Sequence, residues 1–159
     1  MARVEVRFQA LRLDLSVATG SGRLVARRTV RTIDAISEQS KLPFVWGVSD
    51  CTQFAVKVSG AATGRDLSGG FVYSTEEEAS DLISSYGALE NLVTSVVKVE
   101  PTYDLHDLED GDPLVLEIKG KKMLGVKFRR LVVYKTVRGV ACCKLSDADL
   151  GWRVESCLP

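Results

Sequence analysis

The sequence has few of the residues that most often build metal and acid–base sites. Its 159 residues include one histidine, four cysteines and two methionines. A single histidine excludes multi-histidine metal sites, and no C-x-x-C pair is present to indicate a zinc or redox site. No apolar run approaches the ~18–20 residues of a membrane span. The N-terminal segment alternates charged and apolar side chains and contains no signal-peptide core. We therefore expect a soluble, intracellularly made protein without metal or other cofactor.

The composition is that of one folded domain, with 45% apolar and 26% charged residues. The net charge of zero hides a segregation: residues 1–60 carry a balance of +4, residues 61–118 carry −11 and residues 119–159 carry +7. Such blocks can complement each other within one fold or face oppositely charged partners. The basic residues are not interleaved with aromatic ones, apart from a weak hint at residues 128–130, so we expect no nucleic-acid partner.

The hydrophobic pattern predicts helices first and antiparallel strands afterwards, which is an α+β fold with N-terminal helices packed on a C-terminal sheet. Residues 3–8 alternate strictly, residues 11–15 continue the alternation, and a turn or hinge is expected at residues 19–22. We accordingly expect an N-terminal strand arm over residues 1–22 and a compact domain over residues 23–159. Helices are predicted over residues 24–40, 51–63, 76–86 and near 89–93, and strands over residues 114–118, 123–128, 131–137 and 140–145.

Helical periodicity also predicts which side chains face the core. The first helix would bury Ala26, Val30 and Ile33 and expose a basic face that includes Arg28. The apolar faces expected on the later helices are Phe54, Ala55, Val58, Ala61 and Ala62; then Leu82, Ile83 and Tyr86; then Leu89, Leu92 and Val93.

Cys51 is the candidate nucleophile, because it opens the second helix directly after the N-cap candidates Ser49 and Asp50. Backbone N–H groups and the dipole at a helix start stabilise a thiolate, so the position predicts a lowered thiol pKa. A buried, inert cysteine is the structural alternative. The other thiols are weaker candidates, since Cys142 and Cys143 would point to opposite faces of a strand.

A set of short motifs resembles the papain-like cell-wall peptidases of the NlpC type. The likeness is closer to a small bacteriophage family of that lineage, which is encoded among tail-tip genes and has no assigned activity. The resemblance covers about residues 25–155. It rests on Pro43-Phe44-Val45-Trp46-Gly47-Val48-Ser49-Asp50-Cys51, Thr63-Gly64-Arg65-Asp66, Gly111-Asp112, Leu124-Gly125-Val126 and Trp152-Arg153.

The chain departs from active members of that lineage at the general base. Active NlpC-type peptidases have a histidine where this chain has Met123, and a thioether cannot exchange the thiol proton. His106 is a candidate substitute base, because it is the single histidine. An exposed or capping histidine and a histidine that contacts a partner are the alternatives.

Two functional hypotheses follow from the resemblance. The first is a structural component of a phage tail tip or baseplate, located in the virion tail and, during assembly, in the host cytoplasm. It would be a degenerate peptidase-like domain that docks other tail-tip or hub proteins, with residues 1–22 as the candidate docking segment. The second is an active cell-wall cysteine peptidase or amidase that acts on peptidoglycan during genome entry. It would use Cys51 as nucleophile and His106 as base.

Overall fold

The computed structural model describes residues 21–159, with side chains from residue 24 onwards, so residues 1–20 of the predicted arm lie outside it. The first helix, α1, spans Ser21–Ser40. The predicted turn at residues 19–22 was therefore wrong for Ser21 and Gly22, which belong to α1. The N–H groups of a first helical turn need no intrahelical partner, so a Ser-Gly start is compatible with a helix.

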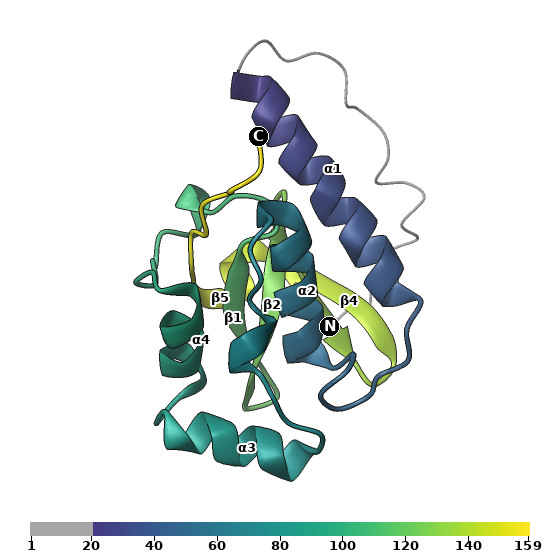
Figure 1. The fold of residues 1–159 in the computed structure, drawn as a ribbon, viewed down its shortest axis with the longest axis vertical. Helices are drawn as coiled ribbons and strands as arrows, with labels where there is room; N and C mark the ends of the chain where they lie inside the picture. Colours follow the sequence, from purple (N-terminus) through teal and green to yellow (C-terminus); the bar gives the residue numbers. More distant parts are fainter. Residues whose placement is uncertain (1–20) are drawn as a thin grey trace.

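The remaining elements follow in the predicted order, as Figure 1 shows. The helices are α2 (Cys51–Thr63), α3 (Glu76–Ser85) and α4 (Leu89–Val97), with short 3-10 turns at Ser68–Gly70, Leu105–Asp107 and Leu145–Asp147. The strands are β1 (Pro113–Ile118), β2 (Lys121–Phe128), β3 (Leu131–Thr136), β4 (Gly139–Lys144) and β5 (Ala148–Gly151). The α+β class is thereby confirmed.

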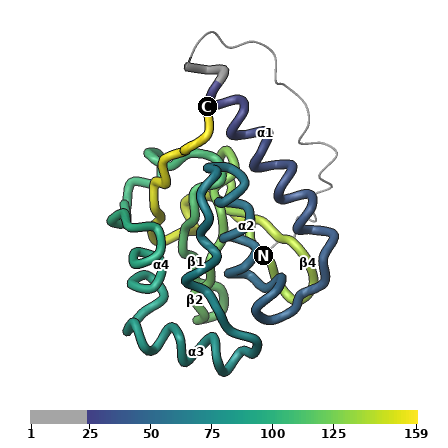
Figure 2. Tube along the Cα trace, in the orientation of Figure 1, coloured from purple at the N-terminus to yellow at the C-terminus, as the bar shows by residue number. Residues whose placement is uncertain are grey.

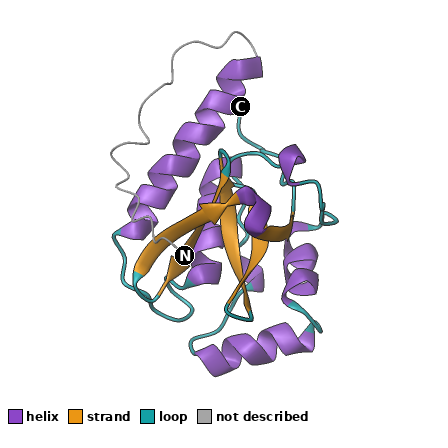
Figure 3. Cartoon of the chain, turned by 180° about the vertical axis from the view of Figure 1, so that it is seen from behind, coloured by secondary structure: helices purple, strands orange, loops and turns teal. Residues whose placement is uncertain are grey.

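The five strands form one antiparallel sheet in the order β4-β3-β2-β1-β5. The turn between β1 and β2 is Lys119-Gly120, both with positive φ (52° and 76°). That conformation matches the twist of a two-residue hairpin. α2 packs directly on β2 and β3, and α1 packs on α2, so the helices lie on one face of the sheet. Figure 3 views the opposite face, where the strands lie in front of α2.

Alternation along the strands divides the core into two clusters, one on each face of the sheet. On the helix side, Val115, Leu124 and Val126 pack with the buried side chains of α2 and α4. On the far side, Leu114 and Leu116 pack with a smaller cluster completed by Leu108, Val132 and Leu145. The expectation that Cys142 and Cys143 point to opposite faces is confirmed, because they pack against the first and second clusters respectively.

The predicted apolar faces of α2 and α4 are buried apart from Ala61, whereas those of α1 and α3 are only half-buried at Ala26, Val30, Ile33, Leu82 and Ile83. Three residues differ clearly from the prediction. Ala61 is exposed, because α2 packs on the sheet through the side of the helix opposite to Ala61. Tyr86 is 44% exposed, because it follows the last residue of α3 and no longer shares the face of Leu82 and Ile83. Arg28, expected on a solvent-facing basic surface, is only 4% exposed. The partners that permit its burial are described below.

Candidate functional site

The carboxylate of Asp50 organises the loop in front of α2. It is fully buried and accepts hydrogen bonds from the backbone N–H of Gln53 (2.9 Å), the backbone N–H of Gly47 (2.6 Å) and the hydroxyl of Tyr73 (3.0 Å). The first of these is the N-cap bond of α2. One carboxylate therefore starts the helix, closes the preceding turn and fixes the next loop.

Gly47 lets the chain pass directly against that neighbouring loop. Its φ is +73°, and a Cβ built on it would lie 1.9 Å from the carbonyl oxygen of Tyr73. No other residue fits this position without moving backbone atoms. The tryptophan before it is partly buried and meets Phe44 edge to face, with 5.2 Å between ring centroids. Phe44, Trp46, Gly47 and Asp50 of the first motif thus each have a structural role.

Cys51 occupies the first position of α2 and is partly buried, but its thiol is not activated. Burial raises the pKa of Cys51 to about 11, and the negative charge of neighbouring Asp50 acts in the same direction. The predicted lowering of this pKa was wrong, because desolvation and the charge of the N-cap carboxylate outweigh the hydrogen bonds from Thr52 and the backbone that favour the thiolate. Little thiolate exists here at neutral pH.

The structure does not bring Cys51 together with Met123 or His106, the two positions considered for the general base. Met123 packs with the cluster on the far face of the sheet, whereas α2 lies on the other face. His106 is exposed, and its neighbours Leu105 and Leu108 pack against the same far-side cluster. The side chain at position 123 and the 3-10 turn that carries His106 therefore pack on the cluster across the sheet from α2.

A buried lysine near the start of α2 was missed by sequence reasoning. Lys135 of β3 is 1% exposed, and its ammonium donates to the carbonyl oxygen of Gln39 at 2.8 Å, near the end of α1. Burial lowers the pKa of Lys135, the nearby charge of Lys57 lowers it further, and Asp50 opposes both effects. A sequence signal existed: Lys135 shares the strand face of buried Val133, so alternation places it in the core.

A second buried polar cluster joins α1 to the start of β1 and the C-terminal segment. Asp112 accepts hydrogen bonds from Arg28 Nη2 (2.5 Å), the N–H of Val154 (2.9 Å) and the N–H of Glu109 (2.7 Å). Burial raises the pKa of Asp112, while the Arg28 charge and the two N–H groups oppose that rise. Arg28 also donates to Glu109 Oε2, to the carbonyl of Val154 and to the carbonyl of Asp110. Figure 2 shows the C-terminal segment running beside the start of α1.

The other motifs also serve the packing. Gly111 has a φ of +87°, and a Cβ on it would lie 2.3 Å from the Cβ of Ala62. A Cβ on Gly125 would lie 2.9 Å from the carbonyl oxygen of Val133. Gly64 ends α2 in the left-handed conformation. Trp152 is fully buried and its indole N–H donates to the hydroxyl of Thr94.

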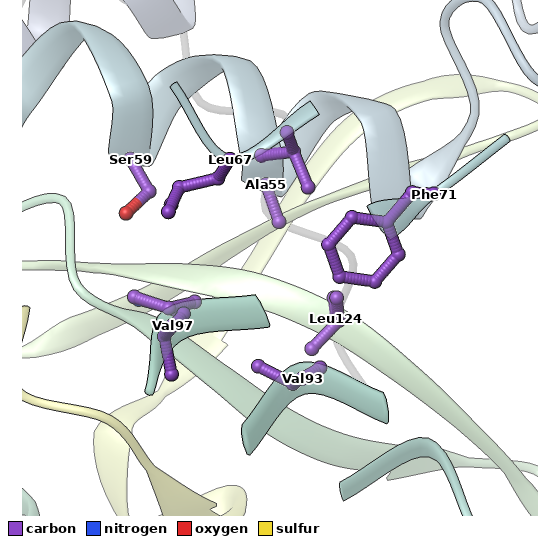
Figure 4. Close-up of a pocket in the computed structure, with 9 residues that line it drawn as sticks. Ala55, Ser59, Leu67, Phe71, Val93, Val97 and Leu124 are labelled. Carbon is purple, nitrogen blue, oxygen red and sulfur yellow. The ribbon is translucent and has the colours of Figure 1, made fainter. Parts of the chain in front are cut away.

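A small cavity beneath α2 is apolar and holds no catalytic group (Figure 4). Ser59 is the one polar residue that lines the cavity. It is fully buried, and its hydroxyl has no hydrogen-bond partner. The lining comprises Ala55, Val56, Ser59, Leu67, Phe71, Val93, Val97, Pro113 and Leu124. Among residues 21–159, no group of three histidine, cysteine or acidic side chains could hold a metal ion.

Residues 24–154 match the family model described as Domain of unknown function (DUF6950). The chain belongs to the DUF6950 family. The matched range includes every strand of the sheet and all but the first three residues of α1. It ends at Val154, which both Arg28 and Asp112 contact. No curated protein matches the chain. Within the described part of the chain, no helix has the length and apolar character needed to cross a membrane.

Proposed function

We propose that this DUF6950 domain is a non-catalytic structural component of a bacteriophage tail tip or baseplate. In this proposal a peptidase-like fold serves as a building block, and the N-terminal arm, residues 1–22, docks neighbouring tail subunits. The tail assignment rests on the resemblance of the motifs to the tail-tip family. The non-catalytic assignment rests chiefly on one observation: the residue at the position expected for the general base is Met123, and it packs on the face of the sheet away from α2.

The structural explanation of each motif supports the same proposal. The aromatic–glycine turn, Asp50, Gly111 with Asp112, Gly125 and Trp152 all have a packing or hydrogen-bonding task. None of these tasks requires a reacting substrate. These motifs can therefore be explained by their contribution to the fold alone.

The alternative is a cell-wall peptidase or amidase that uses Cys51 and His106. Partial exposure of Cys51 at a helix start favours this alternative. Against it stand the raised thiol pKa and the position of the 3-10 turn that carries His106 on the far face of the sheet. An active enzyme would need a lower pKa of Cys51 and a different position of the turn that carries His106.

The proposal is tested with phage particles assembled from variants of this chain. We expect mass spectrometry to find the chain in purified virions, and Cys51→Ser particles to infect as well as wild type. The exposed Cys157→Ser variant is the matched control. Asp50→Ala should reduce incorporation, because it removes the acceptor shared by Gln53 and Gly47. Absence of the chain from virions would contradict the proposal.

The hydrolase alternative has its own readout. Purified wild-type chain is incubated with peptidoglycan, and release of soluble fragments is followed. We expect no release above that of Cys51→Ser. Release that Cys51→Ser abolishes would establish the alternative, and a further loss in His106→Ala would identify the base.

A further inference from the structure

One end of the described structure carries exposed apolar side chains, which we call the apolar patch. It consists of Leu42, Val45 and Val48 in the loop before α2, and Val137 in the turn between β3 and β4. The N–H of Leu42 (3.3 Å) and the ammonium of Lys135 (2.8 Å) both donate to the carbonyl oxygen of Gln39, which holds the loop beside the strand that leads to the turn. Grouped apolar surface of this kind marks interaction sites in soluble proteins.

Two cations border the apolar patch and have no counter-charge among the described residues. Lys57 of α2 lies beside Val48, since its ammonium donates to the carbonyl oxygen of Val48 at 2.5 Å. Arg138 occupies the turn between β3 and β4. Both side chains are exposed, and neither forms an ion pair with a described residue. Lys41 differs, because it pairs with Glu38. The patch is therefore apolar with a positive border.

A second surface, the acidic loop over residues 99–107, has the opposite charge. Tyr103 is 78% exposed there, and the carboxylates of Glu100, Asp104 and Asp107 are exposed around it. None of these three carboxylates forms an ion pair with a described residue. Lys98 directly before the loop leaves three negative charges against one positive charge. The loop thus combines an exposed aromatic ring with unpaired negative charge.

The backbone of the acidic loop is anchored on both sides of Tyr103. Thr102 exchanges two backbone hydrogen bonds with Gly151 of β5, at 2.8 and 3.0 Å. Asp104 accepts a hydrogen bond from the N–H of His106 at 3.1 Å and so caps the 3-10 turn that follows. A tyrosine on fixed backbone provides a large contact area and loses little conformational entropy on binding. Tyr103 is therefore suited to anchor an interface.

The apolar patch and the acidic loop lie at opposite edges of the sheet. The patch includes the turn that leads into β4, whereas the loop pairs with β5. β4 and β5 are the outermost strands, as Figure 1 shows, and four interstrand spacings separate them by about 19 Å. The loop therefore cannot cover the patch of its own copy. We propose that copies of this chain associate head to tail, with the acidic loop of one copy docked on the apolar patch of the next.

Charge complementarity is the reason for choosing a second copy as the partner. Lys57 and Arg138 belong to the two basic blocks of the sequence, and the carboxylates of the loop belong to the acidic block. These charges are left over when the blocks pair within the fold. A head-to-tail contact brings them together around Tyr103 and the patch. Because the two surfaces differ, the contact closes into a ring or propagates.

This inference adds a contact between copies to the proposed structural role and does not depend on residues 1–22. Its failure would leave the virion test untouched, because a tail protein can dock a different subunit. Equally, absence from virions would not abolish self-association.

Charge reversal tests the contact in the full-length chain. Lys57→Glu with Arg138→Glu reverses the border of the patch, and Glu100→Lys with Asp107→Lys reverses the loop without removing the cap made by Asp104. In sedimentation experiments we expect the wild-type chain to self-associate and each double variant alone to do so at least tenfold more weakly, with unchanged circular dichroism spectra. An equimolar mixture of the two variants should associate again, because each reversed surface then meets its opposite.

Matched controls make the same changes of net charge elsewhere. Arg27→Glu with Arg130→Glu, and Glu77→Lys with Asp81→Lys, alter exposed residues outside both surfaces. Both controls should associate like the wild type. A wild-type chain that stays monomeric at about 1 mM, controls that weaken association as much as the test variants, or a mixture that stays dissociated would overturn the proposal.

A cross-linking measurement locates the contact. Full-length chains with and without ¹⁵N are mixed and treated with a carbodiimide, which joins an ammonium to a carboxylate in contact with it. We expect links from Lys57 to Glu100 or Asp104 that join ¹⁵N and ¹⁴N peptides. Lys57→Arg keeps the charge but lacks the amine, so this variant should retain association and lose the link. Links from Lys57 only within one copy, or only to the carboxylates of α3, would overturn the proposal.

Discussion

Asp50 illustrates how one side chain can build a site-like geometry and oppose its chemistry. Its carboxylate caps α2 and closes the turn at Gly47, yet its charge raises the pKa of the adjacent Cys51 thiol. An amide at this position would keep the acceptor oxygen for the cap but carry no charge. An amide therefore separates the cap of α2 from the charge, although its NH2 group cannot accept the hydrogen bond from Gly47.

We predict that Asp50→Asn lowers the pKa of Cys51 below about 11. Thiolate reacts with alkylating agents, so the alkylation rate at pH 8 should rise about threefold to tenfold. The rate is measured against pH with peptide-resolved mass spectrometry, and Cys157 in the same protein is the internal control. An unchanged Cys51 rate in a folded variant would show that burial alone sets this pKa.

Ser59 gives a second test at this scale, this time of stability. Its buried hydroxyl has no partner and faces apolar side chains in Figure 4. Ser59→Ala removes an unsatisfied polar group and favours the helix, so the free energy of unfolding should rise by about 1 kcal/mol. Ser95→Ala is the matched control, since that hydroxyl donates to the carbonyl of Leu92 and its loss should not stabilise. Urea denaturation measures both variants.

Helix α1 is the element whose docking depends most on buried charge. Near its start, Arg28 is bound by Asp112 and by the carbonyl of Val154; near its end, Gln39 accepts a hydrogen bond from Lys135. Its apolar contribution is modest, because Ile36 is its only fully buried hydrophobic residue among those with described side chains. The helix is therefore positioned by polar contacts at both ends.

We predict that Arg28→Met destabilises the protein by about 3–5 kcal/mol, because Asp112 remains buried without its counter-charge. Arg27→Met should change stability by less than about 0.5 kcal/mol, since Arg27 is exposed. Thermal and urea unfolding report both values. Equal effects of the two substitutions would show that Arg28 acts through general charge and not through the buried pair.

Sequence patterns predicted the elements well because those patterns are local. The predicted helix start at residue 76 is confirmed, because Thr75 caps α3 and three glutamates follow it, and the predicted strands before and after residues 119–122 are joined by the tight Lys119-Gly120 turn. The inward position of Arg28 could not be predicted, because its acceptors lie at residues 109–112 and 154. For the candidate site, the helix start at Cys51 was predictable, but the burial that raises its pKa is a long-range property.

At the scale of the whole molecule, the segregated charges are partly matched within the fold. Six of the seven ion pairs among the described residues join the acidic block, residues 61–118, to one of the two basic blocks. Examples are Lys122 with Glu90 and Lys127 with Asp110. Complementation inside one fold was one of the two expectations from the sequence, and these pairs support it.

We predict that trypsin cleaves the arm at Arg3, Arg7 and Arg12 in dilute protein and that assembly protects these sites. Backbone paired in a sheet is a poor protease substrate, so protection should appear in virions. Mass spectrometry of timed digests measures the cleavage, with the exposed Arg138 turn as an internal reference. Equal cleavage in dilute and assembled protein would contradict docking of the arm.

The sequence by itself determined the order of helices and strands, the helix caps and the position of Cys51, because each depends on residues close in the chain. It also determined that two cysteines of β4 face opposite ways, since strand alternation is local. Only the tertiary structure decided that Arg28 and Lys135 are buried, that Met123 and His106 lie across the sheet from α2, and that burial beside Asp50 keeps the thiol protonated. Burial and electrostatics depend on contacts between segments that are distant in the sequence, and those contacts form only in the folded chain.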